Sequence, residues 1–137
     1  VIPSANAVMA DNLWVLGLIL ENQEYTKKSK NMLDSVTSYF SEGRSSNYSQ
    51  WAQLLAKLAY SFKEVVIVGQ NAKEVNKELQ KNYLPNVIFQ ISEKESQLSL
   101  LKDRYYKNET LIYVCENKVC LRPSKSIREA LEQIKNN

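Results

Sequence analysis

Two nearby cysteines, Cys115 and Cys120, form the most specific chemical pattern in this 137-residue chain. Between them lie Asn117 and Lys118, which are typical of a tight turn joining two strands. If these two residues form the turn, Cys115 faces Cys120 in a non-hydrogen-bonded pair, whose Cα atoms lie ~4.5 Å apart. That separation is at the short end of disulfide geometry, so a bridge there would be strained and readily reduced.

The sequence leaves two interpretations of this pair open. One is a redox-labile disulfide, and the other is two reduced cysteines that pack as small hydrophobic side chains on a buried strand. We favour the second, because free cysteine is commonly buried and no neighbouring motif lowers the pKa of either thiol. The spacing of Cys115 and Cys120 also differs from the C-x-x-C of thiol oxidoreductases.

Other catalytic chemistries lack the residues they need. The chain has no histidine, which excludes Ser-His-Asp and Cys-His catalysis and histidine-bound metal sites. Two cysteines without histidine cannot make a four-ligand structural zinc site. Asp11 and Glu21 fall near opposite ends of one predicted helix, so no acid–base pair of carboxylates is established. We therefore expect no metal and no cofactor, and we expect that the chain is not a catalyst alone.

Two short segments carry weaker binding signals. Gly69 follows a β-branched run, but the glycines of the dinucleotide motif G-x-G-x-x-G are missing, so we interpret it as a turn residue. Ser4 and Asn6 lie in a small-residue segment that enters an apolar helix. They are candidates for lining a pocket, and the alternative is that one of them simply caps the helix.

The first part of the chain, residues 1–62, is predicted to be helical. Apolar spacing indicates helices over residues 6–21, 23–40 and 49–62, with a loop from Gly43 to Asn47. The first helix is apolar almost all round, which is typical of a helix inside a larger protein. We expect one of its apolar stripes to comprise Met9, Leu13, Leu16 and Leu20.

Residues 63–137 change to alternating strands and helices. Strands are predicted over residues 65–68, 87–91, 111–115 and 119–121. Helices are predicted from Asn71 to before Pro85, over 97–102, and from a capping box at Ser126 onward. The fold class is therefore α+β or α/β: a helical segment followed by a small βαβαββα domain. We expect its sheet to be mostly parallel, with a terminal antiparallel hairpin.

Charge and hydropathy point to few partners. The 18 basic and 15 acidic residues are interspersed without a clustered basic surface, so we expect no nucleic-acid partner. The longest apolar run, residues 13–20, is too short to span a bilayer, so no membrane partner is expected. No signal-sequence pattern opens the chain, but its start does not assign a compartment. The compartment is left unknown, with the cytoplasm favoured.

Several segments together resemble the C-terminal region of a known family. They are Val1 to Val8 with the Leu-rich helix that follows, Glu64 to Gly69, Tyr83 to Asn86, and Tyr113 to Cys120. The family is the thioredoxin-domain-containing proteins of the spermatogenesis-associated type, related to six-hairpin N-acylglucosamine 2-epimerase-like proteins. Ala5 and Ala7 stand where the family pattern has Gly and Ser, which puts a pocket at this loop in doubt.

The resemblance implies that this chain is a C-terminal fragment of a protein with an activity related to sugar-processing enzymes. Residues 1–62 would then be the end of an α/α toroid. The expected partner is the missing N-terminal part of the same protein, or a second copy bound through the apolar first helix. Two alternatives stay open. One is a stand-alone thioredoxin-like redox module using Cys115 and Cys120, although Gly69-Gln70-Asn71 supplies no cysteine at the first strand-to-helix turn. The other is a helical interaction scaffold.

Overall fold

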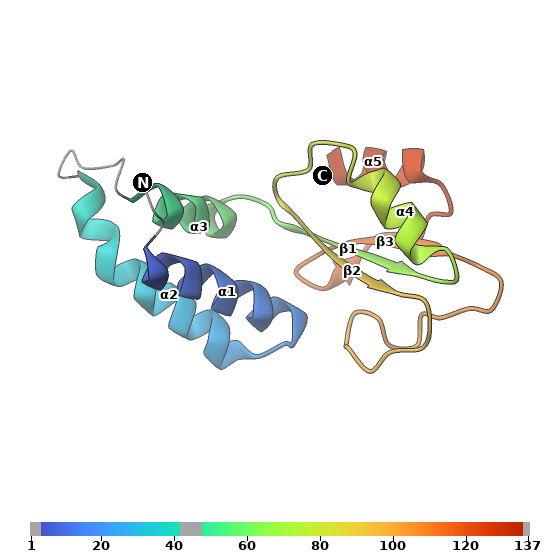
Figure 1. Cartoon of the computed structure of the whole chain (residues 1–137), viewed down its shortest axis with the longest axis horizontal. Helices are drawn as coiled ribbons and strands as arrows, with labels where there is room; N and C mark the ends of the chain where they lie inside the picture. The colour runs from blue at the N-terminus through green and yellow to red at the C-terminus, as the bar shows by residue number, and fades with distance from the viewer. Residues whose placement is uncertain (1–3, 42–47, 136–137) are drawn as a thin grey trace. The chain divides into compact units, whose positions relative to one another are not determined.

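The chain divides after Tyr60 into two units, residues 1–60 and residues 61–137. The predicted division lay two residues later, after Phe62. The computed structural model describes residues 4–41 and 48–135 (Figure 1). The loop predicted from Gly43 to Asn47 and the segment Val1 to Pro3 lie outside the described residues.

Unit 1 is built from helices. They are α1 (Ala5–Ile19), α2 (Gln23–Thr37), the short 3-10 helix η1 (Ser38–Ser41) and α3 (Ser49–Ala59). The turn between α1 and α2 is short, and Asn22 ends it by capping α2: its Oδ1 accepts hydrogen bonds from the backbone N–H groups of Glu24 and Tyr25, at 3.0 and 3.3 Å. Because the connection is this short, α1 and α2 pack as neighbours.

Small residues make the contact between α1 and α2. The buried residues of α1 are Ala7, Ala10, Trp14 and Gly17. The hydroxyl of Ser29 on α2 donates a 2.7 Å hydrogen bond to the carbonyl oxygen of Ala10. A Cβ added at Gly17 would lie only 2.5 Å from Cγ2 of Thr26. The two helix backbones therefore approach closely along this seam.

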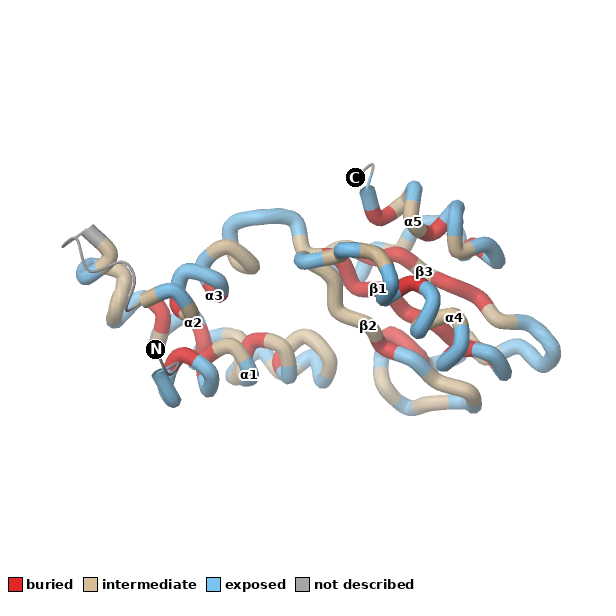
Figure 2. Tube along the Cα trace, turned by 45° about the horizontal axis from the view of Figure 1, so that its top comes forward, coloured by how far each residue is buried: buried red, intermediate tan, exposed pale blue. Residues whose placement is uncertain are grey.

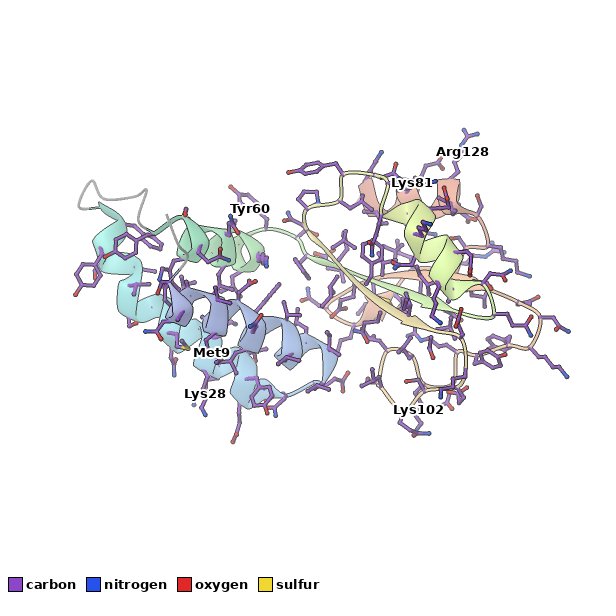
Figure 3. All side chains as sticks on the ribbon, viewed as in Figure 1. Met9, Lys28, Tyr60, Lys81, Lys102 and Arg128 are labelled. Atoms are coloured by element: carbon purple, nitrogen blue, oxygen red, sulfur yellow. A yellow bond between two sulfur atoms is a disulfide. The ribbon has the colours of Figure 1, made fainter. Side chains whose placement is uncertain are left out.

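The seam determines which side of α1 is buried. Met9, Leu16 and Leu20, from one predicted apolar stripe, are all exposed, whereas the face toward α2 carries the buried residues. Ala7, Ala10 and Gly17 allow the backbones of α1 and α2 to approach, and Trp14 is the one large side chain of α1 that is buried with them. Figure 3 shows the side chains of α1, with Met9 labelled.

Unit 2 contains a four-stranded mixed sheet in the order β2-β1-β3-β4. The strands are β1 (Lys63–Val68), β2 (Val87–Ser92), β3 (Leu111–Glu116) and β4 (Val119–Cys120). Strand β1 pairs in parallel with β2 and antiparallel with β3, and β3 pairs antiparallel with β4. The fold class is therefore mixed α and β, and the expectation of a mostly parallel sheet is wrong. Apolar runs such as Val65 to Val68 indicate a buried strand but not the direction of its neighbour.

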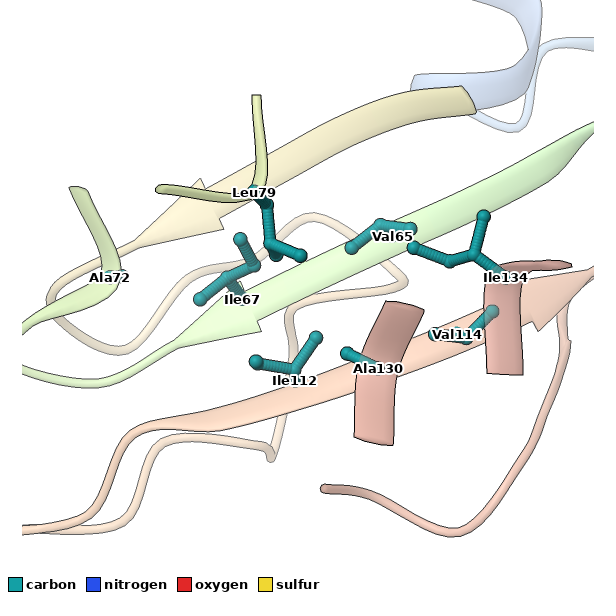
Figure 4. Packing of buried hydrophobic residues seen from close by; sticks show 8 residues of the cluster. All are labelled: Val65, Ile67, Ala72, Leu79, Ile112, Val114, Ala130 and Ile134. Carbon is teal, nitrogen blue, oxygen red and sulfur yellow. The ribbon is translucent and has the colours of Figure 1, made fainter. Parts of the chain in front are cut away.

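The helices α4 (Ala72–Leu79) and α5 (Ile127–Lys135) cover one face of this sheet. Alternate residues of the strands point toward them, as the two-residue period of a strand requires. Figure 4 shows the cluster that results: Val65 and Ile67 from β1, Ile112 and Val114 from β3, Ala72 and Leu79 from α4, and Ala130 and Ile134 from α5.

The opposite face is covered by the segment between β2 and β3. Val66, Val68 and Cys115 of the sheet pack there against Leu100 and Leu101. With both faces covered, β1 is buried along its whole length (Figure 2). This second face carries the candidate site.

The covering segment is not the helix that was predicted over residues 97–102. It forms one turn, in which the N–H groups of Leu101 and Lys102 both donate to the carbonyl oxygen of Leu98. Asp103 then adopts a positive φ of 58°, which stops helical propagation after that turn.

Candidate thiol–disulfide site

The β3–β4 hairpin brings Cys115 and Cys120 together. Asn117 and Lys118 form its two-residue turn with φ angles of 50° and 68°, the positive values that a type I′ hairpin requires. Cys115 therefore pairs with Cys120 across the strands, as the spacing predicts. The two sulfurs are bonded, with the Cα atoms 3.9 Å apart. The favoured interpretation, two reduced thiols, is therefore wrong for this structure.

The two sulfurs differ in environment. Cys115 is 1% exposed and belongs to the apolar cluster on the second face of the sheet. Cys120 is only partly buried, because β4 is the edge strand of the sheet. Of the two cysteines, Cys120 is therefore the more accessible to a soluble thiol.

Arg104 places a positive charge beside the sulfur of Cys120. Both of its terminal nitrogens, Nη1 and Nη2, lie 3.2 Å from Sγ of Cys120. The guanidinium also stacks over the ring of Tyr113, 4.5 Å from the ring centroid, which holds it in place. Burial raises the pKa of Tyr113, helped by Tyr106 and Glu109 and opposed by Arg104, so its phenol stays protonated.

Glu64 lies on the buried side of the same pair. It is the register partner of Cys115 on the neighbouring strand β1 and is 3% exposed. Its Oε2 accepts a 3.0 Å hydrogen bond from the backbone N–H of Lys118 in the hairpin turn. This contact ties the turn of the hairpin to the central strand of the sheet.

A second glutamate anchors the hairpin from the opposite face. Lys63, which is buried, donates a hydrogen bond from Nζ to the carboxylate of Glu116. Hydrogen bonds from Lys63 and then Ser61 hold the pKa of Glu116 below its usual value. A lowered carboxyl pKa stabilises the fold above the ordinary carboxyl range, and this contribution is lost as the pH falls through the folded-state value.

Together these groups can carry out thiol–disulfide exchange. A thiolate is the reactive form of cysteine, and a neighbouring guanidinium favours it. The reduced form of the pair is thereby stabilised, which makes the disulfide easier to reduce. The sequence pointed to the two cysteines but missed Arg104 and Glu64. For Glu64, one signal was available: it directly precedes the strand predicted over residues 65–68, two and four residues before Val66 and Val68. In a strand that begins earlier, as β1 does, these three residues share one face.

The remaining predicted site residues lie elsewhere. Ser4 is the N-cap residue of α1 without a side-chain cap hydrogen bond, and Asn6 lies in the first turn of that helix. Both are exposed and belong to unit 1, whereas the cysteines belong to unit 2. Gly69 is the turn residue after β1, with a φ of 139°.

Within residues 4–41 and 48–135, no group of three or more His, Cys, Asp or Glu side chains is placed to hold a metal ion. None of the helices described there is long and apolar enough to cross a membrane. No protein-family model, curated protein or solved structure matches the chain.

Proposed function

We propose that unit 2 acts in thiol–disulfide exchange through Cys115 and Cys120. The observation that carries this proposal is the guanidinium of Arg104, with both terminal nitrogens 3.2 Å from the sulfur of Cys120. Charge-assisted contacts of this kind stabilise a thiolate more than a thiol or a disulfide. Cys120 is accordingly the sulfur that exchanges with external thiols, and Cys115 is its buried partner.

The reaction with a low-mass thiol proceeds in two steps. An external thiolate attacks Sγ of Cys120, the bond between the two protein sulfurs breaks, and Cys115 leaves with the electron pair. A second external thiolate then attacks the external sulfur of the mixed disulfide and releases Cys120 as a thiolate beside Arg104. Two external thiols are oxidised to their disulfide, and the protein pair takes up the two electrons.

Single-cysteine variants test this assignment with glutathione disulfide as the probe. Cys115→Ser retains only Cys120 and is expected to form a mixed disulfide with glutathione, detected by intact mass and peptide mapping. Cys120→Ser retains only the buried Cys115 and is expected to react at least about tenfold more slowly, since exchange requires access to the sulfur. Equal rates, or faster reaction at Cys115, would overturn the proposal.

We also propose that unit 1 is the end of a six-hairpin α/α toroid of the family that the sequence resembles. The observation favouring this second role is the outward face of α1, where Val8, Met9, Leu16 and Leu20 are exposed. Further helices of such a toroid would cover these side chains, because a contiguous apolar face on a soluble protein marks a contact surface. Unit 2 would then be a redox domain attached to a protein with a sugar-enzyme-like architecture.

Self-association tests this second role. With α1 uncovered, we expect the chain to form dimers or larger species as its concentration rises, measured by sedimentation velocity. The variant Met9→Lys with Leu16→Lys should stay monomeric at the same concentrations, and Lys28→Glu on α2 serves as a control that keeps the apolar face. A wild-type chain that is monomeric throughout contradicts the role proposed for α1.

A further inference from the structure

Glu64 and Cys115 are two buried groups placed side by side. They face each other in the antiparallel register of β1 and β3, so their side chains share the second face of the sheet. Directly opposite residues in such a pair have Cβ atoms ~4.5–5.5 Å apart. Glu64 is 3% exposed and Cys115 is 1% exposed, so solvent has little access to either group.

The backbone of Lys118 links this carboxylate to the disulfide. Its N–H donates to Oε2 of Glu64 at 3.0 Å, and its carbonyl oxygen lies 3.9 Å from Sγ of Cys120. One residue of the turn therefore contacts both the carboxylate and the accessible sulfur. The carboxylate of Glu64 reaches the hairpin itself, and it does so on the face that holds both cysteines.

Formation of the disulfide creates a need for a proton acceptor at this position. The buried thiol of Cys115 must lose its proton before its sulfur can attack, because the thiolate is the nucleophile. Arg104 and Tyr113 also pack on this face, but a guanidinium has no acceptor site and the raised pKa of Tyr113 keeps its phenol protonated. A carboxylate can take the proton.

We infer that Glu64 accepts the proton of Cys115 when the reduced pair closes on a mixed disulfide at Cys120, an assignment that rests on the proposed exchange function. In this step the S–H bond of Cys115 breaks and its proton passes to the carboxylate of Glu64. The bond between Cys115 and Cys120 forms while the bond from Cys120 to the external sulfur breaks. The external thiolate leaves with the electron pair and takes up the proton, which restores the carboxylate.

Glu64→Gln removes the proton acceptor but keeps an oxygen that can accept from Lys118. The reduced variant is mixed with glutathione disulfide. Samples are quenched rapidly with acid, and mass spectrometry follows the conversion of the mixed disulfide at Cys120 to the closed Cys115–Cys120 disulfide, which releases the second glutathione. At pH 7 we expect ring closure to slow by at least about tenfold. A general base typically contributes about 10²-fold or more, and water can replace part of this contribution by accepting the proton in the variant. The first step, attack by Cys120, should stay within about twofold of wild type because Arg104 is unchanged.

The pH profile separates a proton-transfer role from a structural one. Between pH 6 and pH 8, closure in Glu64→Gln should rise about tenfold per pH unit, since only thiolate formed by hydroxide then attacks, and wild type should rise less steeply. Glu64→Asp keeps a carboxylate and should recover part of the rate. Glu132→Gln, which changes an exposed glutamate on α5 away from the hairpin, should close like wild type.

The possible failures are distinguishable. Wild-type closure rates in Glu64→Gln, or an Asp variant as slow as the Gln variant, overturn the role of Glu64 and leave the exchange function standing. Slowing of both steps in Glu64→Gln indicates a structural role and also overturns the inference. A wild-type chain that never forms the mixed disulfide overturns the exchange function and the inference together.

Discussion

Replacing Arg104 with alanine is expected to slow the reaction of reduced Cys120 with iodoacetamide at pH 7 by about tenfold. An opposite charge at hydrogen-bond distance shifts an ionisable group by about 1–3 pKa units toward its charged form. The lost thiolate population is partly offset, because a more basic thiolate is a better nucleophile. The measurement is the alkylation rate of Cys115→Ser with and without Arg104→Ala, followed by intact mass.

Two further variants show whether the charge or its placement matters. Arg104→Lys keeps the positive charge but loses the planar fork and the stacking on Tyr113, so an intermediate rate is expected. Lys102→Ala removes an exposed cation two residues before Arg104 in the chain and should react like its parent. An Arg104→Ala variant that reacts at the parent rate would mean that the contact with Cys120 does not activate the sulfur.

Gly69→Ala is expected to destabilise the fold strongly, and more than Gly17→Ala. Gly69 has a φ of 139°, where side chains are rarely tolerated, and its added Cβ would clash with the carbonyl oxygen of Glu109 and lie 2.5 Å from Cα of Thr110. Both neighbours are backbone atoms and cannot rotate away. Backbone strain and overpacking each cost about 1–3 kcal/mol, so we expect a loss of about 2–6 kcal/mol in the free energy of unfolding.

Urea unfolding followed by circular dichroism measures this loss. The midpoint should fall while the slope with urea concentration is retained, because the change affects the native turn. Gly17→Ala is the matched control. Its added Cβ would lie 2.5 Å from Cγ2 of Thr26 and 3.0 and 3.1 Å from the backbone atoms N of Thr26 and O of Asn22. The helical backbone at Gly17 tolerates alanine, and the Thr26 side chain is the nearest group, so we expect a smaller loss than at Gly69. A Gly69→Ala protein that unfolds like wild type would contradict the packing of this turn against residues 109 and 110.

The elements of the fold could largely be predicted from local patterns. The β-branched run at residues 65–68 lies within strand β1, and Asn117-Lys118 forms the predicted turn, with Asn117 in a left-handed conformation that asparagine tolerates. Local patterns did not predict the features that depend on contacts between residues far apart in the sequence. The turn at residues 98–102 has helical spacing but ends at Asp103. Which face of α1 is buried depends on its packing against α2.

The candidate site could be predicted only in part, for the same reason. Cys115 and Cys120 are close in the sequence, so their pairing follows from one turn. Arg104 reaches Cys120 only because the segment after β2 folds back across the sheet, and Glu64 meets Cys115 only through the antiparallel pairing of β1 with β3. Neither arrangement leaves a periodic pattern in the sequence.

The most direct test of the account is the reduction potential of the Cys115–Cys120 pair in the wild-type chain. The chain is equilibrated in a series of glutathione buffers, free thiols are alkylated, and the oxidised fraction is read from the intact mass. We expect a reversible two-electron transition between about −180 and −270 mV, the range of exchange-active dithiols. A pair that stays oxidised below about −300 mV would be a structural disulfide, and a pair that stays reduced throughout would be core packing. Either result would contradict a role in thiol–disulfide exchange.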